Sequence, residues 1–248
     1  MLRGTGWSAR ENLREPDETA RAERAPAPAA SCDGEHQPQR RAVNVTRIIA
    51  GSRGGRRIAM PRGDRTRPTS DRVREALFSV IAAWAGTAAE PPERALAGLA
   101  FCDLYAGSGA VGLEAASRGA TRVLLVERDS RTAQLIRQNA EALQLAIEIA
   151  TTPVRQLLRR SPAQTFDIVF ADPPYELEST VVSDQLEQLV TNRWVGARSL
   201  IVVERSRRSP DLVWPLATAK RWSRAYGETI LSFGSLEPAY GELPEELS

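Results

Sequence analysis

Short apolar runs alternate with helix-like segments along the chain from residue 99 onward. Uninterrupted apolar runs are typical of strands buried on both faces, and apolar residues spaced by three and four are typical of helices that cover a sheet. The expected strands are 99–105, 121–126, 147–150, 166–171, 200–203 and 230–233, and the expected helices are 108–118, 130–143 and 154–159. This alternation predicts an α/β fold, an open, doubly wound and mostly parallel sheet within residues 95–248.

Before this domain the pattern changes twice. Residues 1–44 carry almost no bulky apolar side chains. They cannot bury enough surface to offset the entropy of ordering, so we expect a disordered extension. Residues 45–94 are expected to form a small hairpin-plus-helix attachment, in which Thr69, Ser70 or Asp71 begins the helix. The apolar face of that helix comprises Val73, Ala76, Leu77, Val80, Ile81 and Trp84.

Charge is distributed unevenly, although the formal net charge is only +2. The segment from Arg40 to Arg74 is dense in arginine and contains only two acidic residues, Asp64 and Asp71. Arginine makes planar, bidentate contacts with phosphate, so this segment predicts contact with nucleic acid. A solvated basic loop has the same composition, and charge alone does not separate the two interpretations. The candidate contacts are Arg47, Arg53, Arg56, Arg57, Arg67 and Arg72.

Composition also excludes several classes of protein. No apolar run approaches the ~20 residues that cross a bilayer, so we expect no membrane span. Two cysteines and one histidine supply neither a disulfide framework nor a zinc cluster, and we expect no metal site. Any catalysis therefore has to use carboxylates, backbone groups or a cofactor, unless His36 takes part.

A glycine-rich loop joins the strand expected at 99–105 to the next helix. Its small residues let the backbone approach a ligand at a helix N-terminus. An acid follows at the end of the next expected strand, at the spacing where a carboxylate binds ribose hydroxyls. The candidate cofactor-binding residues are Asp103, Tyr105, Ala106, Gly107, Ser108, Gly109, Glu127 and Arg128.

Two cofactors are compatible with this loop. The glycine spacing and Glu127 are those of a dinucleotide site, so NAD and an oxidoreductase stay open at this point. However, Asp103 would repel a pyrophosphate, whereas it would attract the positive amino and sulfonium groups of S-adenosylmethionine. The loop therefore favours a methyl donor.

The strand expected at 166–171 ends in a second motif, Asp172-Pro173-Pro174-Tyr175. In a doubly wound sheet this segment should lie near the glycine loop, because strand carboxyl ends meet at the ligand crevice. The Asp172 carboxylate and the Pro173 carbonyl can each accept one N–H of an exocyclic amine, and so stabilise the charge that develops on its nitrogen. Neither proline has an N–H that competes for these acceptors, and Tyr175 offers a face on which an extruded base can stack. These four residues are the candidate catalytic set.

At these motifs the chain resembles the RsmD-type small-subunit rRNA guanine-N2 methyltransferases. The likeness rests on both motifs and on the segments 46–51 (TRIIAG), 67–75 (RPTSDRVRE), 104–109 (LYAGSG), 114–120 (EAASRGA) and 226–229 (YGET). It implies a seven-stranded, Rossmann-like class I methyltransferase domain that uses S-adenosyl-L-methionine. It also implies a cytoplasmic, monomeric enzyme that acts on 16S rRNA, on the small ribosomal subunit or on its assembly intermediates, with the arginine segment gripping RNA.

The sequence departs from this family in two places. Residues 150–154 (ATTPV) lack the Asp or Asn that often binds the cofactor adenine, so backbone groups are expected to do so. Family members usually begin near the TRII segment, which suggests that native translation starts at Val43 or Val45. Among alternatives, the second motif also suits amino-methylation of DNA adenine or cytosine, and a non-catalytic RNA-binding protein would keep the arginine segment.

Overall fold

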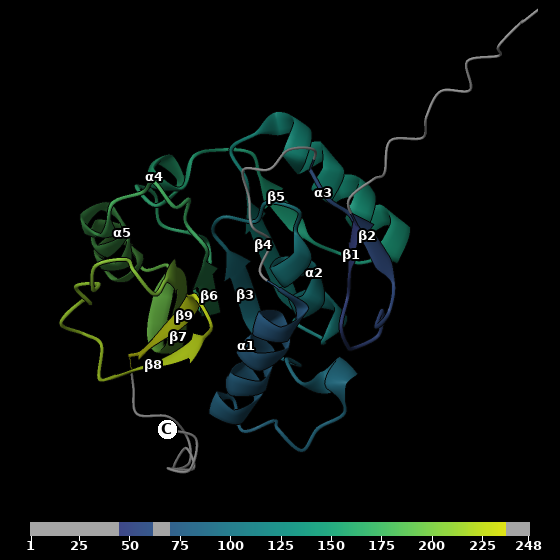
Figure 1. Cartoon of the computed structure of the whole chain (residues 1–248), viewed down its shortest axis with the longest axis horizontal. Coiled ribbons are helices and arrows are strands. Elements are labelled where there is room, and N and C mark those ends of the chain that lie inside the picture. The colour runs from purple at the N-terminus through teal and green to yellow at the C-terminus, as the bar shows by residue number, and fades with distance from the viewer. Residues whose placement is uncertain (1–44, 62–69, 237–248) are drawn as a thin grey trace, which may run out of the picture. The chain divides into compact units, whose positions relative to one another are not determined.

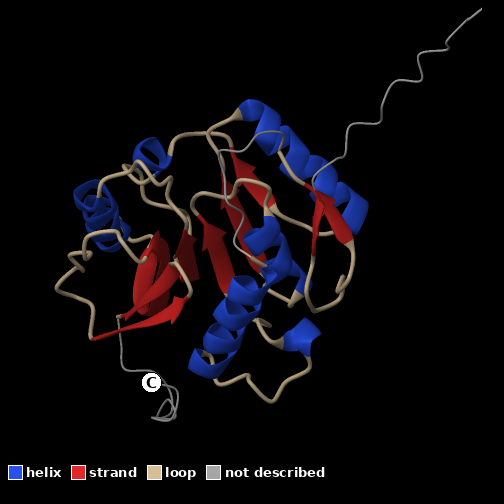
Figure 2. Ribbon diagram, in the orientation of Figure 1, coloured by secondary structure: helices blue, strands red, loops and turns tan. Residues whose placement is uncertain are grey.

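The computed structural model describes residues 45–61 and 70–236. The expectations for residues 1–44 and for Arg67 lie outside the described residues. Seven of the described strands form one sheet, in the order β5-β4-β3-β6-β7-β9-β8 (Figures 1 and 2). These are β3 (Ala100–Asp103), β4 (Arg122–Val126), β5 (Glu148–Ala150), β6 (Phe166–Ala171), β7 (Val195–Ser206), β8 (Lys220–Tyr226) and β9 (Thr229–Ser235).

The order of the strands places a crevice at the centre of the sheet. Strands β5, β4, β3, β6 and β7 run parallel, whereas β9 pairs antiparallel with both β7 and β8. The chain proceeds outward from β3 through β4 to β5, and then returns to β6 on the other side of β3. At such a reversal the connections on either side diverge, so a ligand can bind beyond the carboxyl ends of β3 and β6.

Helices cover both faces of the sheet (Figure 2). Because side chains alternate along a strand, Phe101 packs on one face and its neighbour Cys102 on the other. The first face packs against α1 (Asp71–Trp84), α2 (Ala110–Ser117) and α3 (Ser130–Leu143). The second packs against α4 (Val154–Leu157) and α5 (Ser179–Thr191). The doubly wound fold expected from the sequence is confirmed.

The attachment begins with a two-stranded antiparallel hairpin, β1 (Val45–Arg47) and β2 (Arg57–Ala59). Its buried side chains Ile48 and Ile58 pack with residues of α2 and α3. Helix α1 starts after Ser70, whose Oγ accepts the Val73 N–H at 3.3 Å, so Ser70 is the N-cap among the three expected candidates.

The boundaries of most elements agree with the sequence pattern, and two elements were not expected from it. Helix α3 and strand β6 have the expected limits, whereas β7 extends well beyond 200–203 on both sides. The expected linker 86–94 includes a short 3₁₀ turn, η1 (Pro92–Arg94). Helix α5 and strand β8 are the unexpected elements. No helix among residues 45–61 and 70–236 is long and apolar enough to cross a membrane.

Candidate active site

The glycine loop connects β3 to α2 in a conformation that requires its glycines. Gly107 and Gly109 have φ values of +53° and +81°, which are unfavourable for residues with a Cβ. The Gly109 N–H closes the turn on the Ala106 carbonyl at 2.7 Å, and α2 begins at the next residue. A Cβ added at Gly107 would meet nothing within 4 Å, so this side of the loop faces open space that a ligand can occupy.

Asp103 lies beneath this loop at the end of β3 and is 1% exposed. Its Oδ2 accepts the Gly112 N–H at 3.1 Å, whereas Oδ1 is buried without a hydrogen-bond partner among the described residues. Burial raises the pKa of Asp103 to about 7, against the opposing effect of the Gly112 and Tyr105 N–H groups. A cation placed at Oδ1 would satisfy the acceptor and lower this pKa.

Glu127 fixes the loop from the neighbouring strand. It follows β4, and its carboxylate accepts the Gly107 N–H at 3.1 Å and the Asp129 N–H at 2.8 Å. Gly112 permits close packing, since a Cβ there would lie 2.7 Å from Leu125 Cγ. Arg128 is exposed beside Glu127. The predicted cofactor residues therefore surround one loop.

Asp172 directly follows β6, the strand that pairs with β3. The register places Asp103 opposite Phe170, two residues before Asp172. Burial raises the pKa of Asp172 well above its usual range, and the negative charges of Glu204 and Asp103 raise it further, while Arg205 opposes them. The register also pairs Phe170 with Val202 of β7, so Asp103, Asp172 and Glu204 lie at the carboxyl ends of three adjacent strands.

The remaining residues of the second motif differ in exposure. Pro173 is buried, Pro174 is exposed, and the Tyr175 side chain is 74% exposed. The loop that follows is held by Arg205 of β7, whose Nη1 donates to the Leu177 carbonyl at 2.9 Å. Arg205 Nη2 contacts Ser179 Oγ at 3.3 Å.

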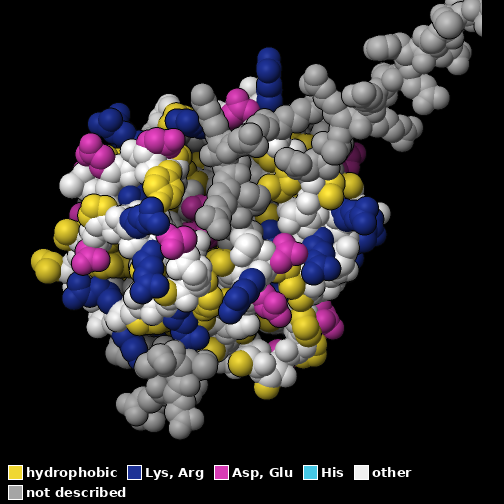
Figure 3. All heavy atoms as spheres, in the orientation of Figure 1, with side chains coloured by type: hydrophobic (Ala, Val, Ile, Leu, Met, Phe, Trp, Pro, Cys, Tyr) yellow, Lys and Arg dark blue, Asp and Glu magenta, His cyan; other side chains and the backbone are white. Residues whose placement is uncertain are grey.

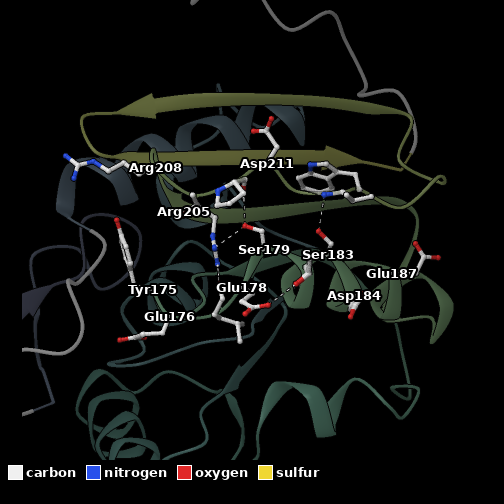
Figure 4. Close-up of a pocket in the computed structure, with 16 residues that line it drawn as sticks. Tyr175, Glu176, Glu178, Ser179, Ser183, Asp184, Glu187, Arg205, Arg208 and Asp211 are labelled. Carbon is white, nitrogen blue, oxygen red and sulfur yellow. Dashed lines mark hydrogen bonds between the residues drawn. The ribbon is translucent and has the colours of Figure 1, made fainter.

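A pocket of about 840 Å³ opens beside this loop (Figure 4). Tyr175 and Arg208 lie at one end of the pocket, and Asp184 and Glu187 of α5 lie at the other. Of the four-residue motif only Tyr175 lines this pocket, and neither Asp172 nor the glycine loop does.

The candidate RNA contacts lie on the hairpin and at the start of α1. Arg47 pairs with Asp71 at 3.1 Å and remains 63% exposed. Arg53 Nε donates to the Leu143 carbonyl, and Arg56 Nη2 to the Ala142 carbonyl at 3.4 Å, so both side chains reach the C-terminal end of α3. Arg57 and Arg72 are exposed. On the face shown in Figure 3, the basic side chains are interspersed with acidic ones.

Another arginine of the basic segment has a structural position. Arg74 of α1 is fully buried and donates to the Arg47 carbonyl at 2.7 Å, to Thr46 Oγ1 at 3.3 Å and to Asp71 at 2.9 Å. It therefore ties β1 to α1 and is not available to RNA. The arginines of this segment therefore have two roles. Arg74 connects β1 to α1 inside the protein, whereas Arg47, Arg57 and Arg72 place charge on the surface.

Several residues that shape the site were not singled out from the sequence. Glu204 and Arg205 lie in the part of β7 that extends past the expected strand, so the pattern gave no signal for them. Glu114 and Asn139 do leave a signal, because each is a polar residue at a position where its helix turns an apolar face inward. A buried polar residue of this kind indicates a specific partner.

Comparison with known proteins shows similarity over most of the chain. A family model described as "Conserved hypothetical protein 95" matches residues 46–235. The ribosomal RNA small subunit methyltransferase D of Haemophilus influenzae is 31% identical over 186 residues, which are 73% of this chain and 87% of that protein. The protein of the same name from Escherichia coli K12 is 30% identical over 168 residues, 68% and 78% of the two chains.

Solved structures extend this similarity to the fold. A putative methyltransferase from Escherichia coli superposes with a TM-score of 0.65 at 26% identity. The superposition covers 77% of this chain and 97% of that one. The region matched by the family model contains both the glycine loop and the Asp-Pro-Pro-Tyr segment.

Proposed function

This chain belongs to the family described as conserved hypothetical protein 95, and we propose that it methylates the exocyclic N2 amine of a guanine in 16S rRNA. It is an RsmD-type methyltransferase of small-subunit rRNA that uses S-adenosylmethionine. The observation that carries the proposal is the placement of Asp172-Pro173-Pro174-Tyr175 at the carboxyl end of β6, beside Asp103 and the glycine loop on β3.

The described residues fit the methyl donor. The unpartnered Asp103 Oδ1 is an acceptor for a positively charged group, and the open side of Gly107 leaves room for a ligand at the loop. Asp103 and the loop backbone from Tyr105 to Gly109 would hold the donor, with Glu127 fixing the loop and Arg128 at its edge. When bound, S-adenosylmethionine supplies a methyl group on a positively charged sulfur.

The second motif provides the groups that act on the base. The Asp172 carboxylate and the Pro173 carbonyl accept the two N–H groups of the guanine amine, which turns its lone pair toward the methyl group. As positive charge develops on this nitrogen, both acceptors stabilise it more strongly than they do the ground state.

Recognition of RNA is assigned to the hairpin and to the start of α1. Arg47, Arg56 and Arg57 are exposed there, and such guanidinium groups contact phosphates without regard to sequence. Tyr175 offers its exposed ring to the extruded guanine. We further propose that the protein is a cytoplasmic monomer that acts within the assembling small subunit.

Transfer of a labelled methyl group tests the proposed function. The purified protein is incubated with labelled S-adenosylmethionine and, separately, with 16S rRNA, small-subunit particles or naked DNA, followed by nucleoside mass spectrometry. N2-methylguanosine in the RNA or the particles is the expected product. Methyladenine or methylcytosine in DNA alone would contradict the proposal.

A further inference from the structure

One buried amide joins the hairpin to the glycine loop. Asn139 of α3 is 5% exposed, and its Oδ1 accepts the Ala59 N–H at 2.9 Å. Its Nδ2 donates to the Ala59 carbonyl at 2.9 Å and to the Ser108 carbonyl at 3.2 Å. Ala59 is the last residue of β2, and Ser108 lies between the two glycines of the loop. The Asn139 side chain therefore hydrogen-bonds to both the hairpin and the glycine loop.

Asn139 is polar where α3 is otherwise apolar. Its neighbours on the same face, Ala133, Ile136, Ala140 and Leu143, are buried. An amide buried here is unfavourable unless its donors and acceptor are paired. An apolar residue would cover the sheet without that requirement, so the benefit of asparagine lies in its two backbone partners.

The hairpin is also attached to α2, which begins at the loop. Glu114 is fully buried, and its carboxylate accepts the Ile49 and Ala50 N–H groups at 2.6 Å and 2.9 Å. The Ser52 N–H donates to the Ser117 carbonyl at 2.7 Å. These bonds hold the connection between β1 and β2 on α2, whereas Asn139 holds the end of β2 on the glycine loop. A displacement of the hairpin would therefore act, through these hydrogen bonds, on the backbone of the glycine loop.

We propose that Asn139 is a positioning residue that couples RNA binding at the hairpin to donor binding at the glycine loop. This inference rests on the proposed function, which assigns RNA to the hairpin and the donor to the loop. RNA that restrains β2 also restrains Ala59, Asn139 and the Ser108 carbonyl. The loop then loses less conformational entropy when the donor binds, because RNA has already restrained it. By thermodynamic linkage, the donor increases the affinity for RNA by the same factor.

The test measures the dissociation constant of S-adenosylhomocysteine with and without saturating 16S rRNA, on the full chain. In the unaltered protein, RNA should lower this constant by about 5-fold or more, the usual scale of coupling. Asn139→Leu should bring the ratio close to one. Asn139→Asp keeps the volume and the acceptor for the Ala59 N–H but removes both amide N–H donors, and it should have the same effect.

Asn192→Leu is the matched control. Asn192 is a half-buried asparagine, and its Nδ2 donates to the Leu158 carbonyl at 2.7 Å, away from the hairpin and the glycine loop. This variant should keep the ratio of the unaltered protein. A merely structural role for Asn139 would weaken donor binding equally with and without RNA, and an unchanged ratio in both Asn139 variants would overturn the proposal.

Two further outcomes are distinguishable. A ratio of one in the unaltered protein, with RNA bound, overturns the coupling and leaves the proposed function intact. Absence of RNA binding by the unaltered protein overturns the RNA substrate and the coupling together. Thermal melting of each variant identifies any that fails to fold, and the near-isosteric Asn139→Asp then decides the question.

Discussion

The phenol of Tyr175 donates a hydrogen bond to Ser206 Oγ, with 2.7 Å between the two oxygens. This bond joins the loop after β6 to the end of β7 and holds an aromatic ring that is 74% exposed. The Ser206 oxygen also accepts the Arg208 N–H at 3.2 Å. A large exposed ring that is fixed in place is suited to stacking on an extruded base.

Removal of this ring should weaken the use of RNA. We expect Tyr175→Ala to lower kcat/KM for RNA by about 5- to 100-fold, because base–aromatic stacking contributes about 1–3 kcal/mol. Tyr175→Phe keeps the ring and loses only the bond to Ser206, so its effect should be smaller. Ser206→Ala also removes the acceptor of the Arg208 N–H, so its effect should be at least as large as that of Tyr175→Phe. Unchanged kinetics in Tyr175→Ala would refute the stacking role.

The pKa of Asp103 predicts a pH dependence of donor binding. This pKa is about 7, so the carboxyl group is mainly neutral at pH 6 and mainly ionised at pH 8. A positively charged donor should therefore bind more tightly as the pH rises through 7. Asp103→Asn should bind S-adenosylmethionine weakly and with little change between these pH values. Calorimetry checks this, and a pH dependence that persists in the variant would contradict it.

The same group affects stability with a definite sign. The native pKa of Asp103 lies above its ordinary value of 3.8, so the folded protein binds more protons than the unfolded chain between these values. Its contribution to the free energy of unfolding should thus be largest at acidic pH and decrease as the pH rises toward 7. Denaturant titrations measure the free energy of unfolding at each pH. Between these two pKa values it should decrease with rising pH more steeply in the donor-free unaltered protein than in Asp103→Asn.

Glu114 should be important for stability. Its buried carboxylate also accepts Arg118 Nε at 2.9 Å, in addition to two backbone N–H groups of the hairpin. Glu114→Ala leaves the two N–H groups without an acceptor and a largely buried guanidinium without its carboxylate, so we expect a loss of about 3–5 kcal/mol in the free energy of unfolding. Glu75→Ala, at an exposed position of α1, should change it by about 0.5 kcal/mol or less. Equal stability of the two variants would refute this role for Glu114.

Neutralisation of the hairpin arginines should reduce the salt dependence of RNA binding. Replacing Arg47, Arg56 and Arg57 by glutamine removes up to three phosphate contacts, each worth about 0.7 in the slope of log K against log salt for single strands. The control replaces Arg155, Arg159 and Arg193, which are exposed and lie in or after α4 and α5. If the hairpin substitutions left the slope unchanged, these arginines would not contact phosphate, and the segment would be a solvated loop.

The limits of a helix or strand could be predicted from the sequence where its apolar residues follow a single regular spacing. The apolar run 166–171 and the helical spacing over 130–143 gave the limits of β6 and α3. Strand β8 was missed because Lys220, Arg221 and Arg224 make this edge strand polar. Helix α5 does show a helical pattern in the sequence, with Val182, Leu186 and Leu189 at helical spacing.

The site was predictable only in part, for a physical reason. Asp103 ends β3, and Glu127 and Asp172 directly follow β4 and β6, so their positions along the chain indicated a shared edge of the sheet. The role of Asn139 depends on a contact between α3, the hairpin and the loop, and no local pattern specifies which backbone groups will meet an amide. Arg74 showed the converse: it belonged to a segment expected to bind nucleic acid, and the fold buries it as a tie.

The rate of methyl transfer by Asp172→Ala tests the central claim most directly. Single-turnover transfer from labelled S-adenosylmethionine to small-subunit particles is compared between this variant and the unaltered protein, and S-adenosylhomocysteine affinity is measured in parallel. We expect the rate to fall by about 100-fold or more, as for the loss of a group that stabilises developing charge, with the affinity nearly unchanged. Equal rates in the two proteins would contradict the assignment of Asp172 to the reacting amine.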